Sequence, residues 1–89
     1  MSDYVIEWSP PFRKEFKKLP AEIRMRFEEK LELLLQSRMT HPSLRLKKMR
    51  GTDDVWEASI TMNYRFTFQK TAQGLFLRHI GTHDMLQTP

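Results

Sequence analysis

Apolar and polar residues alternate from residue 55 to residue 69, which predicts two half-buried β-strands. If residues 61 to 63 form the turn between them, Ser59 faces Arg65, and Glu57 becomes a diagonal neighbour of Arg65 at roughly 7 to 8 Å. The apolar parity comprises Trp56, Ala58, Ile60, Tyr64, Phe66 and Phe68, and the polar parity Glu57, Ser59, Arg65 and Thr67. The pattern therefore places a carboxylate and a guanidinium on the open face of a sheet.

Helical periodicity dominates the N-terminal part of the chain, after a short strand expected at residues 4 to 8. Ser9 is typical of a helix N-cap, and Pro10 suits the first helical position because its missing N–H needs no partner there. Pro20 ends this helix and begins a second one. The apolar positions at helical spacing are Phe12, Phe16 and Leu19, followed by Ile23, Phe27, Leu31 and Leu34.

The rest of the chain is typical of short strands joined by turns. The periodicity changes at Met39, and His41 and Pro42 mark a break. The elements expected after this break are alternating residues 44 to 48, a loop at 51 to 54, the hairpin, a turn at 73 and 74, and a strand at 75 to 80. Alternation does not decide whether Arg78 or His79 faces outward, and Gly81 indicates a bulge or bend. This order predicts an α+β domain with two N-terminal helices packed on one face of a mainly antiparallel, four- to five-stranded sheet.

Composition fits one domain over residues 1–89, of which 39% are hydrophobic. The absence of cysteine excludes a disulfide framework and a thiolate nucleophile, and it suits a reducing compartment. The N-terminus has no basic-then-apolar signal, and no apolar run reaches the roughly 20 residues that span a bilayer. We therefore expect a cytoplasmic protein without a membrane partner.

Basic residues are concentrated before the hairpin. The formal net charge is +4, and five basic residues without an acid lie between residues 38 and 50: Arg38, Arg45, Lys47, Lys48 and Arg50. Such a run favours polyanions, but it is equally typical of a solvated edge that keeps a strand from aggregating.

The segments DDVWEASITMNYRFTFQ and LRHIGTHD, with the helix start FRKEFKKLP, resemble the RelE/ParE superfamily of bacterial toxin components. The RelE, YoeB and YafQ branch is the most similar. The resemblance covers nearly the whole chain and lies in the order and spacing of short motifs. It implies a RelE-like fold and a toxin neutralised by a cognate antitoxin. In the RelE branch it also implies a ribosome-dependent endoribonuclease that cuts messenger RNA, inhibits translation and needs no cofactor.

The resemblance extends to three residues by position. Arg65 matches an arginine on a family strand, His83 falls where the branch has an arginine or histidine, and His41 is similar to a histidine of YafQ-like members. The chain also departs from the family. Lysines used by RelE-type enzymes are replaced by Glu57 and Ser59, a YafQ aspartate by Asn63, and a terminal tyrosine by Asp84 and Met85.

Metal-free cleavage of RNA requires a base for the ribose 2′-oxygen, a cation for the phosphorane-like transition state, and an acid for the leaving 5′-oxygen. Glu57 or His41 can serve as the base, and His83 as the acid. Arg65 can serve as the cation, together with a lysine. The residues expected to bind RNA are Arg45, Lys47, Lys48, Arg50 and Arg78.

Other interpretations of these residues stay open. Glu57 and Arg65 also fit a cross-strand ion pair, His83 a surface histidine, and His41 a structural role before a proline. A metal site is disfavoured, since His79 and His83 on an extended strand would lie about 13 Å apart.

Two other functions compete with cleavage of messenger RNA. One is a ParE-like, non-catalytic toxin that inhibits DNA gyrase, and the other is a degenerate member that only binds antitoxin or operator. In each case the expected antitoxin is an acidic, largely disordered segment that orders on the basic face and the sheet edges.

Overall fold

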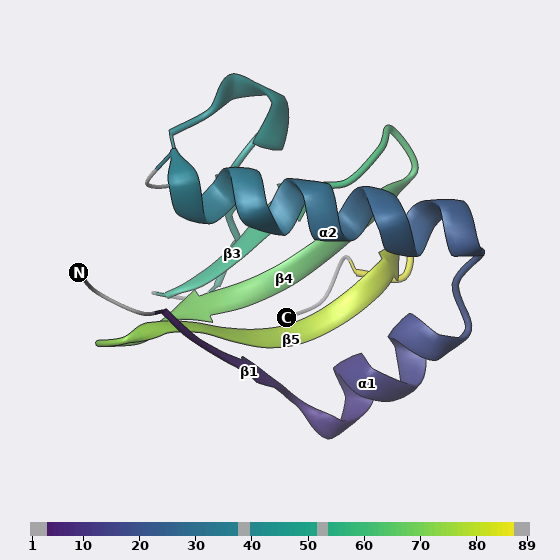
Figure 1. Ribbon diagram of the computed structural model, residues 1–89, viewed down its shortest axis with the longest axis horizontal. Coiled ribbons are helices and arrows are strands. Elements are labelled where there is room, and N and C mark those ends of the chain that lie inside the picture. Colours follow the sequence, from purple (N-terminus) through teal and green to yellow (C-terminus); the bar gives the residue numbers. More distant parts are fainter. Residues whose placement is uncertain (1–3, 38–39, 52–53, 87–89) are drawn as a thin grey trace.

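Two α-helices pack against a five-stranded sheet in the computed structural model, which describes residues 4–37, 40–51 and 54–86 (Figure 1). The elements are β1 (Val5–Trp8), α1 (Pro10–Lys17), α2 (Ala21–Gln36), a short 3₁₀ helix η1 (Pro42–Leu44), β2 (Lys47–Lys48), β3 (Val55–Ser59), β4 (Tyr64–Lys70) and β5 (Gly74–Thr82). Four positions that entered the sequence predictions, Arg38, Met39, Thr52 and Asp53, lie outside the described residues. The expected α+β class is confirmed.

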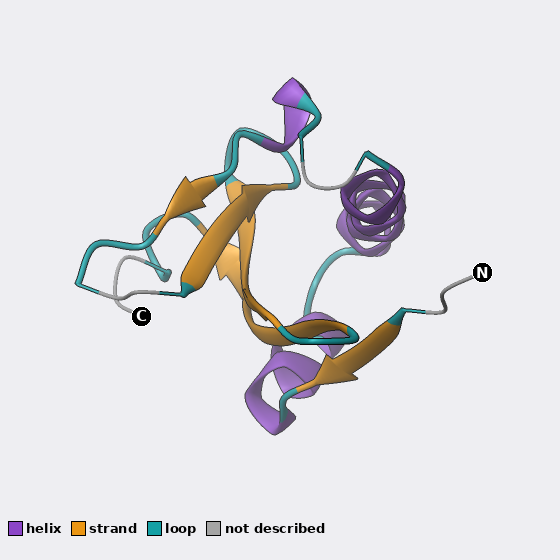
Figure 2. Cartoon of the chain, turned by 90° about the vertical axis from the view of Figure 1, so that its left-hand side faces the viewer, coloured by secondary structure: helices purple, strands orange, loops and turns teal. Residues whose placement is uncertain are grey.

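The strand order across the sheet is β1-β5-β4-β3-β2. β1 runs parallel to β5, whereas the other neighbouring pairs are antiparallel, so the sheet is mainly antiparallel as expected. Figure 2, in which α2 is seen end-on, shows the strong twist of this sheet. α2 lies across one face, and α1 lies near β1 and β5. No helix in the described part of the chain is long and apolar enough to span a membrane.

The register predicted for the central hairpin is confirmed. Ser59 pairs with Arg65, and Glu57 pairs with Thr67. The Ile60 N–H donates to the Tyr64 carbonyl at 2.9 Å and closes the turn. The alternation of the sequence could determine this register because a slip of one residue would turn every phenylalanine of β4 toward the wrong face.

The helix boundaries follow their sequence signals. The Ser9 hydroxyl accepts a hydrogen bond from the Phe12 N–H at 3.1 Å and caps α1, in which Pro10 is the first residue. Pro20 stands at the N-cap of α2. Leu19, expected on the helix stripe, lies beyond the end of α1 but is still buried.

The core lies between the helices and the sheet. Its centre is aromatic, because Phe27 of α2 meets Phe66 of β4 edge-on at 5.0 Å between ring centroids, and Trp8 meets Phe12 in the same way at 4.9 Å. The largest fully buried side chains are Phe12, Phe27, Phe66, Phe68, Leu34, Leu44, Leu75, Leu77 and Ile80. These side chains hold the helices against one face and leave the other face of the hairpin for polar residues.

Two local predictions were wrong. The alternation expected from Leu44 begins later, because Leu44 ends η1 and only Lys47–Lys48 pair as a strand. The irregularity expected at Gly81 lies instead at Arg78, while Gly81 continues β5 and pairs with Arg65. A glycine in a strand is thus an ambiguous signal, since Gly81 pairs regularly and a Cβ there would meet only ordinary contacts.

Candidate functional site

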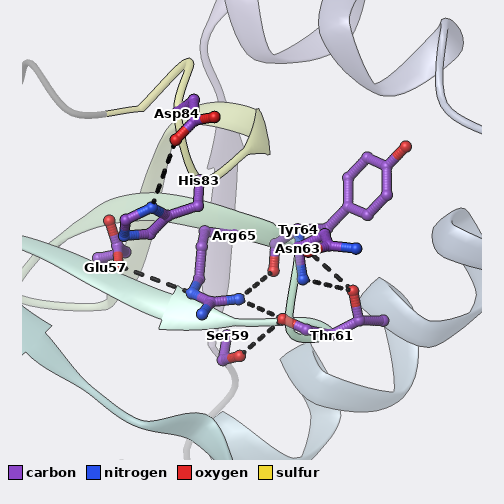
Figure 3. A network of polar contacts seen from close by, with 8 residues as sticks. All are labelled: Glu57, Ser59, Thr61, Asn63, Tyr64, Arg65, His83 and Asp84. Atoms are coloured by element: carbon purple, nitrogen blue, oxygen red, sulfur yellow. Dashed lines mark hydrogen bonds and ion pairs between the residues drawn. The ribbon is translucent and has the colours of Figure 1, made fainter.

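Glu57 of β3 and Arg65 of β4 form a diagonal ion pair in which Oε1 and Nε are 3.8 Å apart (Figure 3). The two side chains are only 10% and 13% exposed. The sequence predicted their side of the sheet to be open, but the structure buries most of it, and Ser59 and Thr67 are buried as well. The turn after β5 lies on this face, and its buried Leu86 lines the same hollow as Glu57.

The guanidinium of Arg65 is fixed by the hairpin that carries it. Its Nη1 donates to the carbonyl of Thr61 and, at 3.2 Å, to the carbonyl of Tyr64. The Ser59 hydroxyl donates to the same Thr61 carbonyl at 3.0 Å. The sequence indicated Thr61 only as a turn residue, since a backbone carbonyl has no signature in a sequence pattern. These contacts fix the orientation of the Arg65 guanidinium.

His83 follows β5 and lies on the same side of the sheet as Glu57 and Arg65, as Figure 3 shows. Its backbone N–H donates to the carbonyl of Asn63 at 2.8 Å, so the hairpin turn holds the C-terminal turn in place. Its imidazole is about half exposed, and Nδ1 is 3.9 Å from Oδ1 of Asp84. The histidine is therefore both accessible and anchored through its backbone.

Two hollows meet at His83. The first has a volume of about 520 Å³ and is lined by Met62, Asn63, Tyr64, Arg65, Thr82, His83 and Asp84. The second has a volume of about 600 Å³ and is lined by Lys47, Lys48, Met49, Arg50, Glu57, His83 and Leu86. The imidazole thus stands between a hollow with the guanidinium and a hollow with the carboxylate. In this arrangement the carboxylate can accept a proton, the guanidinium can neutralise an anion, and the imidazole between them can donate a proton.

The basic residues before the hairpin form one border of the second hollow, and the sheet register separates the two lysines. Lys47 pairs with Glu57, whereas Lys48 pairs with Trp56. Nζ of Lys48 is 5.7 Å from the centroid of the Trp56 ring, and Nζ of Lys70 is 4.7 Å from it. Because paired residues of neighbouring strands share a face, Lys47 is the lysine on the side of Glu57.

Three other predicted site residues lie apart from this group. Arg45 is exposed at the end of η1, in a left-handed conformation with φ of 46°. Arg78 lines a separate hollow of about 180 Å³ with His79 and donates from Nη1 to the Gln69 side chain at 2.9 Å. His41 is absent from the residues that line the two hollows at His83.

His41 has a local structural contact instead. Its Nδ1 accepts a hydrogen bond from the Ser43 N–H at 3.2 Å, which caps η1. The histidine is exposed at the start of that short helix. In residues 4–37, 40–51 and 54–86 there is also no cluster of three or more histidine, cysteine, aspartate or glutamate residues that could hold a metal ion.

Two helices packed on a mixed sheet of this order match the RelE-like fold. The E. coli DinJ–YafQ complex contains a chain that matches with a TM-score of 0.78 at 17% identity, over 97% of this chain and 100% of that one. The YoeB dimer from Staphylococcus aureus matches with a TM-score of 0.78 at 12% identity, over 90% and 97% of the two chains. The RelB–RelE complex from Methanococcus jannaschii matches with a TM-score of 0.72 at 20% identity, over 90% and 93%.

Comparison of sequences adds nothing to this likeness. No protein-family model matches the chain, and no curated protein matches it. The similarity to these solved structures is therefore one of fold.

Proposed function

We propose that this chain is the toxin of a type II toxin–antitoxin system and acts as a ribosome-dependent endoribonuclease on messenger RNA, which inhibits translation in the cytoplasm. One observation carries the proposal. Glu57, Arg65 and His83 come from β3, β4 and the turn after β5, and they line two hollows that adjoin at the imidazole. The resemblance to RelE, YoeB and YafQ toxins supplies the substrate class.

The proposed reaction uses the ribose next to the scissile phosphate as its nucleophile. Glu57 accepts the proton of the 2′-hydroxyl, and the 2′-oxygen forms a bond to phosphorus. The bond from phosphorus to the 5′-oxygen breaks, and His83 donates a proton to that oxygen. The products are a 2′,3′-cyclic phosphate and a free 5′-hydroxyl. Arg65 neutralises the charge that develops on the phosphoryl oxygens.

The geometry favours Glu57 over His41 as the base. Glu57 shares a hollow with His83, whereas the Nδ1 of His41 caps η1. Lys47 and Arg50 at the border of the Glu57 hollow supply contacts to neighbouring phosphates. Orientation of the message by the ribosome supplies the remaining rate acceleration, since holding two reacting groups in place can lower a barrier by roughly 7 to 11 kcal/mol.

The proposed protein partner is a cognate antitoxin. The DinJ–YafQ and RelB–RelE neighbours are toxin–antitoxin complexes. With a net charge of +4, this chain suits an acidic segment that orders on binding. Such a segment would cover the basic border of the second hollow and block access to Glu57.

The test is induction of the chain in cells that lack an antitoxin, followed by mapping of the 5′ ends of a translated message. We expect cuts within the reading frame, and we expect cutting to fall by roughly 10²- to 10³-fold in Arg65→Ala and by roughly 10²- to 10⁴-fold in His83→Ala. Arg26→Ala is the matched control, because Arg26 is an exposed arginine of α2 paired only with Glu22 in the described structure. Equal cutting by the wild type and both site variants would contradict the proposal. Intact messages together with inhibited DNA supercoiling by purified gyrase would favour the ParE-like function instead.

A further inference from the structure

β5 contains a bulge immediately before the residues that lead to the site. Thr67 of β4 pairs with His79, but the next residue, Phe68, pairs with Leu77, so Arg78 is the extra residue on β5. A bulge of this kind bends its strand and shifts the register of everything beyond it by one residue. The position of the chain after Arg78 therefore depends on the bulge staying where it is.

His83 lies only five residues beyond the bulge and inherits its register. After the bulge, Gly81 pairs with Arg65, and Thr82 pairs with Tyr64. The His83 N–H then reaches the Asn63 carbonyl at 2.8 Å. A slip of one residue in this segment would move His83 along the strand and turn the preceding side chains toward the opposite face.

A side chain from α1 holds the two residues that follow the bulge. Oε1 of Glu15 accepts a hydrogen bond from the Ile80 N–H at 3.1 Å. The two carboxylate oxygens also lie 3.2 and 3.3 Å from Nδ1 of His79. The Glu15 side chain is 28% exposed and that of His79 is 34% exposed, so water competes only partly for these contacts.

The side of β5 that faces β1 needs this carboxylate, because β1 ends before it can pair with the last residues of β5. β1 stops at Trp8, which pairs with Leu77, and α1 begins two residues later. The Ser9 hydroxyl donates to the Arg78 carbonyl at 2.7 Å, and the Glu15 carboxylate accepts the hydrogen bond of the Ile80 N–H. Buried or half-buried backbone groups require such partners, which here come from side chains instead of a strand.

On the other side of β5, Thr67 completes the support of the bulge. Its Oγ1 accepts a hydrogen bond from the His79 N–H at 3.1 Å. The N–H groups of His79 and Ile80 are therefore satisfied by one side chain from β4 and one from α1. Glu15 and Ile80 are separated by 65 positions in the sequence, so α1 and the end of β5 are joined through this contact.

We propose that Glu15 is a positioning residue for His83. By holding the Ile80 N–H and the His79 imidazole, its carboxylate keeps the bulge at Arg78 and thereby sets His83 between the two hollows. The effect on cleavage rests on the function proposed above, whereas the effect on the place of His83 does not. Loss of the carboxylate moves His83 while the helices and the core stay folded.

The test combines NMR with kinetics on the full chain. The amide and imidazole signals of His83 are assigned in the isolated protein, and single-turnover cleavage of a ribosome-bound message is measured. We expect Glu15→Ala to shift the His83 signals and to lower the single-turnover rate constant at saturation at least tenfold with the half-saturating concentration unchanged, since displacement of an acid by about 1 Å can cost roughly 10²-fold. Glu15→Gln, which keeps an oxygen acceptor for Ile80, should restore both toward the wild type. Glu22→Ala, an exposed glutamate of α2, should change neither.

The proposal is overturned if Glu15→Ala moves only the signals of His79 and Ile80 and leaves those of His83 in place. If Glu15→Ala does not fold, Glu15→Asp tests the same point. Its charged side chain is one methylene shorter and cannot keep the contacts with both Ile80 and His79. Moved His83 signals then support the proposal, and unmoved ones overturn it. A wild-type chain that leaves messages intact refutes the proposed nuclease, while the His83 signals still decide the role of Glu15.

Discussion

Arg65 and Glu57 meet diagonally across two strands, with Nε and Oε1 3.8 Å apart, although each is paired in the sheet with a different residue. The pair is nearly enclosed, so each charge depends on the other more than in an exposed pair. The guanidinium also donates to two backbone carbonyls of its own hairpin. Arg65 would therefore stay ordered without Glu57, and the carboxylate is available for a chemical role besides the ion pair.

Glu57→Gln separates these two roles, because glutamine has the shape of glutamate but accepts protons poorly. We expect cleavage to fall by roughly 10²- to 10⁴-fold if the carboxylate is the base. The free energy of unfolding should fall by roughly 1 to 3 kcal/mol, because a largely buried guanidinium loses its counter-charge but Arg65 keeps its two carbonyl partners. Cleavage of a translated message and urea denaturation measure the two effects.

His41→Asn is the matched variant, since asparagine can also cap a helix and His41 is the other residue considered as the base. It should cut messages as the wild type does. Normal cutting by Glu57→Gln together with loss of cutting by His41→Asn would reverse the assignment of the base.

Lys47 and Lys48 should differ in their contribution to RNA binding, although they are neighbours in sequence. Lys47 pairs with Glu57, whereas the ammonium of Lys48 lies over the Trp56 ring. For a short single-stranded RNA, Lys47→Ala should reduce the slope of log affinity against log salt by about 0.7, the value for one lost phosphate contact. Lys48→Ala should reduce it by less. Fluorescence anisotropy over a series of salt concentrations provides the measurement, and the opposite order would argue against Glu57's face as the RNA surface.

Gly74 and Gly81, both in β5, should respond oppositely to alanine. A Cβ at Gly74 would clash with the carbonyl oxygen of Val5, which is part of the β1–β5 pairing, so the backbone must move. We expect Gly74→Ala to lower the free energy of unfolding by about 2 kcal/mol or more. A Cβ at Gly81 would have only ordinary contacts with Met85 at 3.7 Å or beyond, so Gly81→Ala should cause no loss. Equal urea midpoints for the two variants would contradict the close approach of β1.

Ser9→Ala should lower the free energy of unfolding, although Ser9 lies near the start of the chain. The hydroxyl is buried and makes two hydrogen bonds, one from the Phe12 N–H and one to the Arg78 carbonyl. Loss of the cap costs about 1 kcal/mol, and loss of the hydrogen bond to the Arg78 carbonyl adds a similar amount, so we expect a loss of about 1–3 kcal/mol.

Ser43→Ala is the control for Ser9→Ala, because Ser43 is exposed and its hydroxyl contacts Lys30 and His41 at the surface. It should change stability by about 0.5 kcal/mol or less. Thermal or urea unfolding of the two variants decides the matter, and a Ser9→Ala variant as stable as Ser43→Ala would rule out the double role of Ser9.

Local patterns in the sequence were sufficient for the elements and for one long-range relationship. Ser9, Pro10 and Pro20 mark helix boundaries because capping and the proline ring act within a few residues. The register that brings Glu57 near Arg65 followed from alternation together with the turn expected at residues 61 to 63, because a slip of one residue would turn Phe66 and Phe68 out of the core. These features depend on contacts between neighbours or across a single tight turn.

The tertiary structure alone decided how those elements close around the site. The two ends of the chain are joined by three features: the parallel pairing of β1 with β5, the bulge at Arg78 and the contact of Glu15 with Ile80. The tertiary structure likewise placed the buried Leu86 in the same hollow as Glu57. No periodicity in the sequence records such contacts, because they depend on how far each strand extends and on which backbone groups are left without a partner. For that reason the residues of the site could be proposed from the sequence, but not the support that holds His83 in its place.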